Sequence, residues 1–370
     1  MKIFNIIAII LACISFNSRA EVFCVADGNS QDLQAALTAA QDNNQDNVIK
    51  IAIGEYVTPN NGFRYVQSKL QNGNLEITGG WSASGNDPCA EQLAENTLNT
   101  ILDGQSQNRV LRIFTSNDTQ VKISNLIIAN GKVANSSGGG LAILTPSVDT
   151  PAATFKIENN LFINNEAEFG GAISVLNANK TYVQNNLVVG NNATEEGSIF
   201  AFAGENAAGI YFTNNTVVNN TSDTASGGAL IRIAESNALI ANNLLWNNDN
   251  VDLKFDAVIK GSLYIENNNI GVRTQTGSAI VSDLNNFSLP PRLEGGFLDF
   301  TPLAISPLVN QGTVSPCVRI VCSKPIPFED DWFPGETDVF GNPRIQNGGI
   351  DIGAFESPHE PDLIFMNGYE

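Results

Sequence analysis

Four charged residues that follow an asparagine-rich segment form the candidate site with the clearest chemistry: Asp249, Asp252, Lys254 and Asp256. In an extended strand, side chains two residues apart point to the same side, so the last three would share one face. Carboxylates are preferred calcium ligands, and a neighbouring lysine can act as the base of a polysaccharide lyase. The alternative, and the commoner role of such a pattern, is a solvated sheet face with cross-strand charge pairing.

A second set of acidic residues occupies equivalent positions in two successive repeats of the sequence. The set consists of Glu166, Glu168, Glu195 and Glu196. If these segments stack, their carboxylates would converge in an acidic groove, and a glycoside hydrolase needs two carboxyl groups about 5–10 Å apart. The alternative is a surface that only confers solubility. Arg109 and Arg112 are candidate contacts for a substrate carboxylate, although an arginine beside a strand also pairs with neighbouring acids.

The tryptophans and the single histidine limit the kinds of binding or catalytic site that the chain can form. Trp81 and Trp332 lie beside glycine-rich or proline-rich stretches and are candidate sugar contacts, whereas Trp246 falls on an apolar track and is expected in the core. The only histidine, His359, lies in a proline-bounded tail. One histidine excludes a His-rich zinc site and disfavours a Ser-His-Asp triad. The sequence has no phosphate-binding loop and no Rossmann fingerprint.

The 370-residue chain is strongly acidic, with 38 acidic against 19 basic side chains and a formal net charge of −19. Such a chain has no basic surplus to release counterions from a phosphate backbone, which excludes nucleic acid as a partner. Hydrophobic residues make up 42% of the sequence, which is enough for a packed core. The most unusual feature is the count of 48 asparagines, many of which lie between residues 159 and 269.

Residues 1–20 have the pattern of a secretory signal peptide: a basic start at Lys2, an apolar run over 3–16 and a small-residue exit at 18–20. Cleavage after residue 20 leaves 17 basic against 38 acidic side chains, a net charge of −21. An alternative is processing as a lipoprotein at Cys13. No later stretch reaches about 18 uninterrupted apolar residues, so no transmembrane helix is expected.

Four cysteines remain after cleavage at residue 20, and an even number in an exported chain favours disulfides. We expect the pairs Cys24–Cys89 and Cys317–Cys322, because each pair lies within one end of the chain. Four cysteines allow three connectivities, so the other two pairings stay open.

Asparagine pairs recur along the middle of the chain and define a repeat. The equivalent positions in successive repeats are Asn125, Asn160, Asn186, Asn215, Asn243 and Asn268. The steps between them are 35, 26, 29, 28 and 25 residues, a range typical of repeat architectures. Each repeat contains several short β-type runs separated by Gly or Asn pairs, without helical periodicity. The sequence therefore predicts an all-β fold, a right-handed parallel β-helix of about nine coils.

Stacked coils would place equivalent asparagines about 4.8 Å apart, so that their amides could form a hydrogen-bonded ladder along the axis. Asparagine also tolerates the left-handed conformation that a tight bend requires. Near the N-terminus, residues 27–46 have helical spacing with Ser30 as a candidate N-cap, and residues 48–53 are expected to form a strand. This helix and the C-terminal segment would protect the two open ends of a monomeric solenoid.

Several segments resemble those of bacterial exported proteins of the right-handed parallel β-helix, or pectin-lyase-like, group. The N-terminal segments are 33–37 (LQAAL), 51–56 (IAIGEY), 77–81 (ITGGW) and 100–104 (TILDG). Three C-terminal segments resemble the "choice-of-anchor Q" type: 306–312 (SPLVNQG), 338–344 (DVFGNPR) and 350–356 (IDIGAFE). The last residues, 364–370 (IFMNGYE), are similar to a terminal tag of some gammaproteobacterial exported proteins.

The resemblance implies a Gram-negative bacterial protein that is secreted or associated with the cell surface. It also implies an organisation in four parts: a signal peptide (1–20), a parallel β-helix with an N-terminal cap (21–290), a C-terminal cap or anchor-like segment (291–356) and a tail (357–370).

A second likeness concerns the segments 162–165 (FINN) and 170–173 (GGAI), which are similar to repeats of polymorphic outer-membrane adhesins. The β-helix scaffold serves both adhesins and polysaccharide-degrading enzymes, so the fold does not decide the function. We expect an exported or cell-surface protein that is non-catalytic and glycan-binding, adhesive or structural. The alternative is a calcium-dependent polysaccharide lyase, or a glycoside hydrolase, acting on extracellular polysaccharide.

Overall fold

The computed structural model describes most of the chain between residues 20 and 360. The described residues are 20–26, 28–67, 73–83, 88–93, 99–115, 118–145, 153–203, 209–223, 228–233, 237–257, 262–277, 280–296, 298–314 and 334–360. The expected signal peptide up to residue 19, with Cys13, lies outside them, as do Cys317, Cys322, Trp332 and the tail from residue 361.

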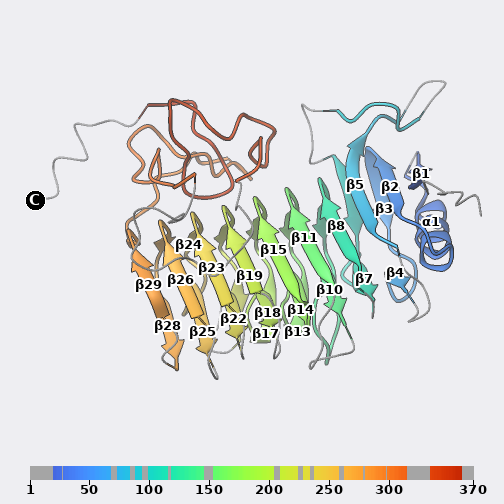
Figure 1. Cartoon of the computed structure of the whole chain (residues 1–370), viewed down its shortest axis with the longest axis horizontal. Helices are drawn as coiled ribbons and strands as arrows, with labels where there is room; N and C mark the ends of the chain where they lie inside the picture. The colour runs from blue at the N-terminus through green and yellow to red at the C-terminus, as the bar shows by residue number, and fades with distance from the viewer. Residues whose placement is uncertain are drawn as a thin grey trace, which may run out of the picture.

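The chain winds through three long parallel sheets, named A, B and C in the order in which each turn enters them (Figure 1). Sheet A consists of β1 (Glu21–Val25), β2 (Asn47–Ala52), β5 (Leu75–Trp81), β8 (Gln120–Ser124), β11 (Thr154–Glu158), β15 (Lys180–Gln184), β19 (Gly209–Thr213), β23 (Asn237–Ala241), β26 (Ser262–Glu266) and β29 (Ile280–Leu284). Sheet B consists of β3 (Gly54–Val57), β6 (Thr100–Asp103), β9 (Ile127–Ala129), β12 (Leu161–Ile163), β16 (Leu187–Val189), β20 (Thr216–Val218), β24 (Leu244–Trp246) and β27 (Asn269–Ile270). Sheet C consists of β4 (Phe63–Val66), β7 (Leu111–Phe114), β10 (Leu141–Leu144), β14 (Ile173–Leu176), β18 (Ile199–Ala203), β22 (Ala229–Ile233), β25 (Leu253–Ala257) and β28 (Arg273–Thr276).

This arrangement confirms the predicted all-β parallel β-helix. Among the described residues it has eight turns of three strands, not about nine, because the repeat is longer near the N-terminus: β5 and β8 begin at Leu75 and Gln120. A short sheet D fills the corner between sheets B and C in three middle turns. Its strands are β13 (Glu166–Phe169), β17 (Asn192–Glu196) and β21 (Thr221–Ser222).

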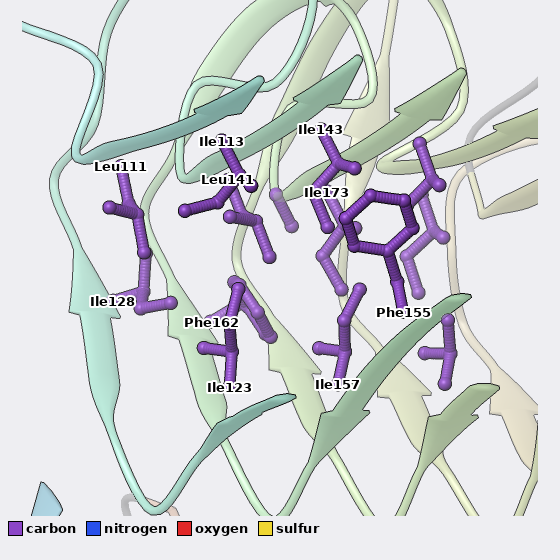
Figure 2. Close-up of a cluster of buried hydrophobic side chains, with 14 of the residues drawn as sticks. Leu111, Ile113, Ile123, Ile128, Leu141, Ile143, Phe155, Ile157, Phe162 and Ile173 are labelled. Carbon is purple, nitrogen blue, oxygen red and sulfur yellow. The ribbon is translucent and has the colours of Figure 1, made fainter. Parts of the chain in front are cut away.

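Hydrophobic side chains alternate along the strands and stack from turn to turn to fill the interior. Strands β8 and β11 pair Ile123 with Ile157 in register, and β10 and β14 pair Ile143 with Val175. Figure 2 shows Leu111, Ile113, Leu141, Ile143 and Ile173 of sheet C facing Ile123, Phe155, Ile157, Ile128 and Phe162 of sheets A and B. A slip of one residue would turn every inward side chain to solvent, so the core fixes the register.

Helix α1 (Ser30–Asp42) closes the N-terminal end of the solenoid beside β1, β2 and β4, as expected (Figure 1). Its buried face consists of Leu33, Ala36, Leu37 and Ala40. The N-cap is Asn29 and not Ser30. The side-chain oxygen of Asn29 accepts hydrogen bonds from the backbone N–H groups of Gln31 and Asp32 at 3.0 and 3.2 Å, which satisfies two donors of the first turn.

The disulfide between Cys24 and Cys89 confirms that predicted pair and ties β1 to the segment after β5. Lys50 lies beside it: its Nζ donates to the Cys89 carbonyl at 3.3 Å and lies 3.7 Å from the centre of the Trp81 ring. The ring face of Trp81 is therefore covered by a cation, which argues against its predicted contact with sugar.

The C-terminal segment packs along the side of the solenoid, on the outer face of sheet B (Figure 1). Outward-facing Leu161, Leu187, Val218 and Leu244 form one hydrophobic cluster with Leu308, Val339, Ile352 and Phe355 of this segment. Trp246 is half-buried against the same cluster. At the C-terminal end, all four residues of β28 are exposed, so these contacts do not cover that strand in the way expected of an end cap.

Candidate functional site

A column of asparagines, buried except for its last member, runs along the corner between sheets A and B. It contains Asn160, Asn186, Asn215, Asn243, Asn268 and Asn286. Each side-chain amide donates to the side-chain oxygen of the next asparagine, at 2.8–3.1 Å. That oxygen also accepts the backbone N–H of the preceding member, as when Asn186 N–H donates to Asn215 at 3.0 Å. The hydrogen bonds between the asparagine side chains of this column therefore all run in one direction, from donors nearer the N-terminal end to acceptors nearer the C-terminal end.

Asn125 was expected in this column but lies outside it. The register of β8 and β11 places Ser124 opposite Glu158, so Asn125 aligns with Asn159 and Leu126 occupies the column position. Asn125 has a φ of 58°, and Asn159 has a φ of 55°. The first asparagine of a pair thus takes the left-handed bend, while the second enters the column.

A second column, at the next corner, was not anticipated. It contains Asn165, Asn191, Asn220 and Asn248, linked by amide hydrogen bonds of 2.8–3.0 Å, and it ends on Asp252. The sequence indicated this column, because four successive repeats hold a second pair of asparagines about five residues after the first. Both columns end on an aspartate, since Asn286 donates to Asp283 at 2.7 Å. A carboxylate suits this position because it only accepts hydrogen bonds.

Because Asp252 ends the second column, the residues of the predicted calcium cluster do not form one site. Asp252 is buried and accepts from Asn248 and from the backbone N–H of Val272, so it does not share a solvent face with Lys254 and Asp256. Burial raises the pKa of Asp252, against the lowering effect of these hydrogen bonds. Among the described His, Cys, Asp and Glu residues, no group of three or more could hold a metal ion.

The other members of the predicted cluster are engaged separately. Asp249 accepts from the backbone N–H of Ser222 at 2.8 Å, and Asp256 accepts from the hydroxyl of Thr276. Lys254 pairs with Glu196 at 3.2 Å.

Two of the four glutamates expected in an acidic groove, Glu166 and Glu196, have other partners. In sheet D, Glu166 lies opposite Asn192 and Glu196 lies opposite Phe169, so the register offsets these two carboxylates. Glu166 forms an ion pair with Lys132 at 2.8 Å. The register and this ion pair therefore separate Glu166 from Glu196 as a hydrolase pair.

A cleft of about 390 Å³ near the N-terminal end gathers cationic side chains in this acidic protein. Its lining includes Arg64, Arg109, Arg112 and Lys132. We call it the arginine cleft. Arg64 of β4 pairs in register with Arg112 of β7, and both belong to the outer face of sheet C. Neither has an acidic partner among the residues that the structure describes, and like charges opposite one another in a sheet are destabilising.

Arg109 supports the wall of the cleft. Its guanidinium donates to the Gly138 and Ser137 carbonyls, both at 2.9 Å, and to the Ser136 hydroxyl at 2.8 Å. Burial, together with the charges of Arg112 and Arg64, lowers the pKa of Arg109 to about 10, so it stays cationic at neutral pH. The arginine predicted to touch substrate thus holds the loop over 136–138, while its charge adds to the cleft.

Helix α1 fixes the edge strand that carries Arg64. The side-chain oxygen of Gln34 accepts the backbone N–H of Arg64 at 2.9 Å, and the Gln34 amide donates to the Arg64 carbonyl at 3.0 Å. Gln41 accepts the backbone N–H of Val66 at 3.0 Å. These glutamines replace a neighbouring strand, so the edge is held without further sheet. The sequence identified Arg109 and Arg112, but Arg64 lies 48 residues before Arg112 and gave no local signal.

His359 is exposed, as expected of a tail residue. No protein-family model matches the chain, and no curated protein matches it significantly. None of the described helices is both long and apolar enough to cross a membrane.

Proposed function

We propose that this protein is an exported β-helix of the pectin-lyase-like group, secreted or held at the cell surface, that binds extracellular glycans without catalysing a reaction. The arginine cleft would bind carboxylate or sulfate groups of such a glycan. The observation that carries the proposal is the position of Arg64, Arg109 and Arg112 in one cleft of a chain with a net charge of −19.

The electrostatics of the cleft support an anionic ligand. Arg64 and Arg112 repel one another across adjacent strands, so a bound anion would remove an energetic cost that the free protein carries. Guanidinium groups bind carboxylates and sulfates through paired, charge-assisted hydrogen bonds. The negative charge elsewhere disfavours polyanions, so we expect binding of short acidic segments rather than long, dense polyanions.

Two observations support export and a role without catalysis. The Cys24–Cys89 disulfide is typical of oxidising compartments and agrees with the signal-peptide pattern. Three of the acidic residues considered for a calcium or hydrolase site are engaged elsewhere: Asp252 ends a column, and Glu166 and Glu196 pair with lysines.

The test is a binding titration of the purified chain with uronate and sulfated oligosaccharides, and with neutral ones, at low and high salt. Arg112→Gln and Arg64→Gln should each weaken binding of the acidic ligand about tenfold, the loss expected for one charge-assisted contact. Arg292→Gln removes the same charge from an exposed position outside the cleft and should change affinity less than twofold.

Equal losses in all three variants, or binding of neutral glycans alone, would contradict the role of the arginine cleft. Formation of unsaturated product from a uronate polymer, dependent on calcium and abolished by chelator, would instead identify a lyase.

A further inference from the structure

Three carboxylates and one guanidinium are buried within residues 334–357, which we call the C-terminal strap. They are Asp338, Arg344, Asp351 and Glu356, each at most 2% exposed. Arg344 Nη1 lies 3.1 Å from Glu356 Oε1. When all four are ionised, the cluster carries one positive and three negative charges. Two negative charges are then buried without a counterion in the cluster, which is costly.

Two of the carboxylates are fixed by backbone donors. Asp351 accepts from the N–H groups of Asn310 and Ser357, both at 2.7 Å. Asp338 accepts from two N–H groups of its own turn and from the Glu356 N–H at 2.9 Å. Glu356 accepts the Asp351 N–H at 3.1–3.2 Å but otherwise depends on Arg344. Glu356 is therefore the member of the cluster that would bind a proton most readily.

The strap rests on sheet B mainly through apolar contacts. Its Ile352 and Phe355 join the cluster formed by outward-facing Leu161, Leu187 and Leu244. A few polar contacts accompany them, such as the Gly353 N–H donating to the Asn242 carbonyl at 2.8 Å.

The close approach of the strap to sheet B depends on a glycine. Gly353 has a φ of 110°, and a Cβ there would lie 2.8 Å from Thr216 Oγ1. The Ala354 N–H donates to the same oxygen at 2.9 Å. This contact explains the glycine of the segment 350–356.

The charged groups that act on Glu356 all belong to the strap: Arg344, Asp351 and Asp338. The solenoid presents neutral groups at the described contacts, namely Thr216 of β20 and the bend residues Asn214 and Asn242. With its amide oxygen turned toward the strap, Asn214 accepts from Arg344 Nε at 3.0 Å. Sheet B therefore offers no positive charge at these contacts to offset the surplus of carboxylates.

We propose that the C-terminal strap is a pH-dependent latch, which closes over sheet B when its buried cluster takes up a proton and opens when Glu356 loses it. Opening would uncover the apolar row of Leu161, Leu187 and Leu244. This latch is independent of the arginine cleft.

The direction of the effect follows from the ionisation of Glu356. Burial, which outweighs the attraction of Arg344, raises the pKa of Glu356 from 4.5 to about 8, and the pKa of Asp351 rises to about 6. Between pH 4.5 and 8 the closed strap holds a proton that the open strap has released. Opening therefore becomes more favourable with rising pH in this window, by up to tenfold per pH unit for one proton, and levels off above it.

The test is hydrogen exchange of the full chain at pH 5–9, read by mass spectrometry and corrected for the intrinsic rate at each pH. Peptides of the strap should lose protection by up to tenfold per pH unit between pH 6 and 8, while peptides of β19 and β23 keep theirs. Glu356→Gln should flatten the strap profile over this range. Glu360→Gln, at an exposed position just after the strap, should keep the normal profile.

A strap protection that does not change with pH in the unmodified chain would overturn the proposal, as would a normal slope in Glu356→Gln. Limited proteolysis of the unmodified chain gives a second measurement that needs no variant. Cleavage within residues 334–357 should be faster relative to a control peptide at pH 8 than at pH 6, and equal relative rates would also overturn the latch.

Discussion

Asn215 lies in the middle of the first asparagine column, where replacing one amide tests the direction of the hydrogen bonds. Its side-chain oxygen accepts from the backbone N–H and the side-chain amide of Asn186, at 3.0 and 3.1 Å. Its own amide donates to the Val183 carbonyl at 2.8 Å and to Asn243 at 3.0 Å. The oxygen of the Asn215 side chain thus accepts and its amide donates. A replacement that keeps the shape of the side chain but lacks the donor should therefore destabilise the fold.

For Asn215→Ala we expect a loss of about 3 kcal/mol in the free energy of unfolding. The buried Asn186 N–H loses its acceptor, which costs about 1–3 kcal/mol, and the lost contacts of the amide add about 1 kcal/mol. Asn215→Asp should cost more, roughly 4–5 kcal/mol, although its shape is nearly unchanged. A carboxylate oxygen would then face the Val183 carbonyl and the Asn243 oxygen, and an unpaired charge would be buried.

The assay is urea unfolding followed by circular dichroism, with hydrogen exchange of peptides around residues 183–243 to locate the change. Asn99→Ala and Asn99→Asp make the same replacements at an exposed asparagine and should change stability by less than about 0.5 kcal/mol. If Asn215→Asp were as stable as Asn215→Ala at neutral pH, the assigned donor direction would be wrong, even if both variants were destabilised.

Two further predictions concern the end of the second column and the N-terminal disulfide. Asp252→Asn should lower the unfolding free energy by about 1–3 kcal/mol at pH 7, because an amide would face the Val272 N–H. Since the raised pKa of Asp252 means that the folded state takes up a proton there on acidification, this group should contribute more stability as the pH falls toward 4, and the variant should lack that contribution. Urea unfolding at pH 4 and 7 should therefore show a larger difference in unfolding free energy between the two proteins at pH 4, and a smaller difference there would refute this assignment. Replacing Cys24 and Cys89 by serine should cost about 4 kcal/mol, the chain-entropy value for a separation of 65 residues. Thermal unfolding of this variant should match that of the reduced unmodified chain, and an unchanged midpoint would contradict the prediction.

Much of the fold could be predicted from the sequence because a stacked repeat encodes it locally. Each turn needs a left-handed bend at the same place, and asparagine supplies it at Asn159, Asn185 and Asn214 with φ values of 54–57°. The predicted position of Asn125 in the column was wrong. Asn125 is a single asparagine, so the sequence does not show whether it corresponds to the first or the second member of the later pairs. Only the pairing of β8 with β11 shows that it takes the bend and leaves the column to Leu126.

The candidate sites were harder to predict, because side chains at a corner do not follow strand alternation. Asp252 turns inward just before β25 and ends a column, whereas alternation placed it beside Lys254 on a solvent face. Arg64 and Arg112 show that residues far apart in the sequence can form one site. They belong to different turns and become neighbours only through the register of β4 and β7.

The sequence by itself determined the parallel β-helix and its capping helix, because repeat period, apolar alternation and bend residues are local properties of the chain. The pairing of Cys24 with Cys89, one of several that the sequence left open, was decided by the tertiary structure. The tertiary structure decided which polar groups meet. Stacking brings residues of one turn next to those of the turns before and after, so it assembled the two asparagine columns and the arginine cleft. It also dispersed the acidic residues that look clustered in the sequence, since a carboxylate at a buried corner is most stable where several N–H groups point at it.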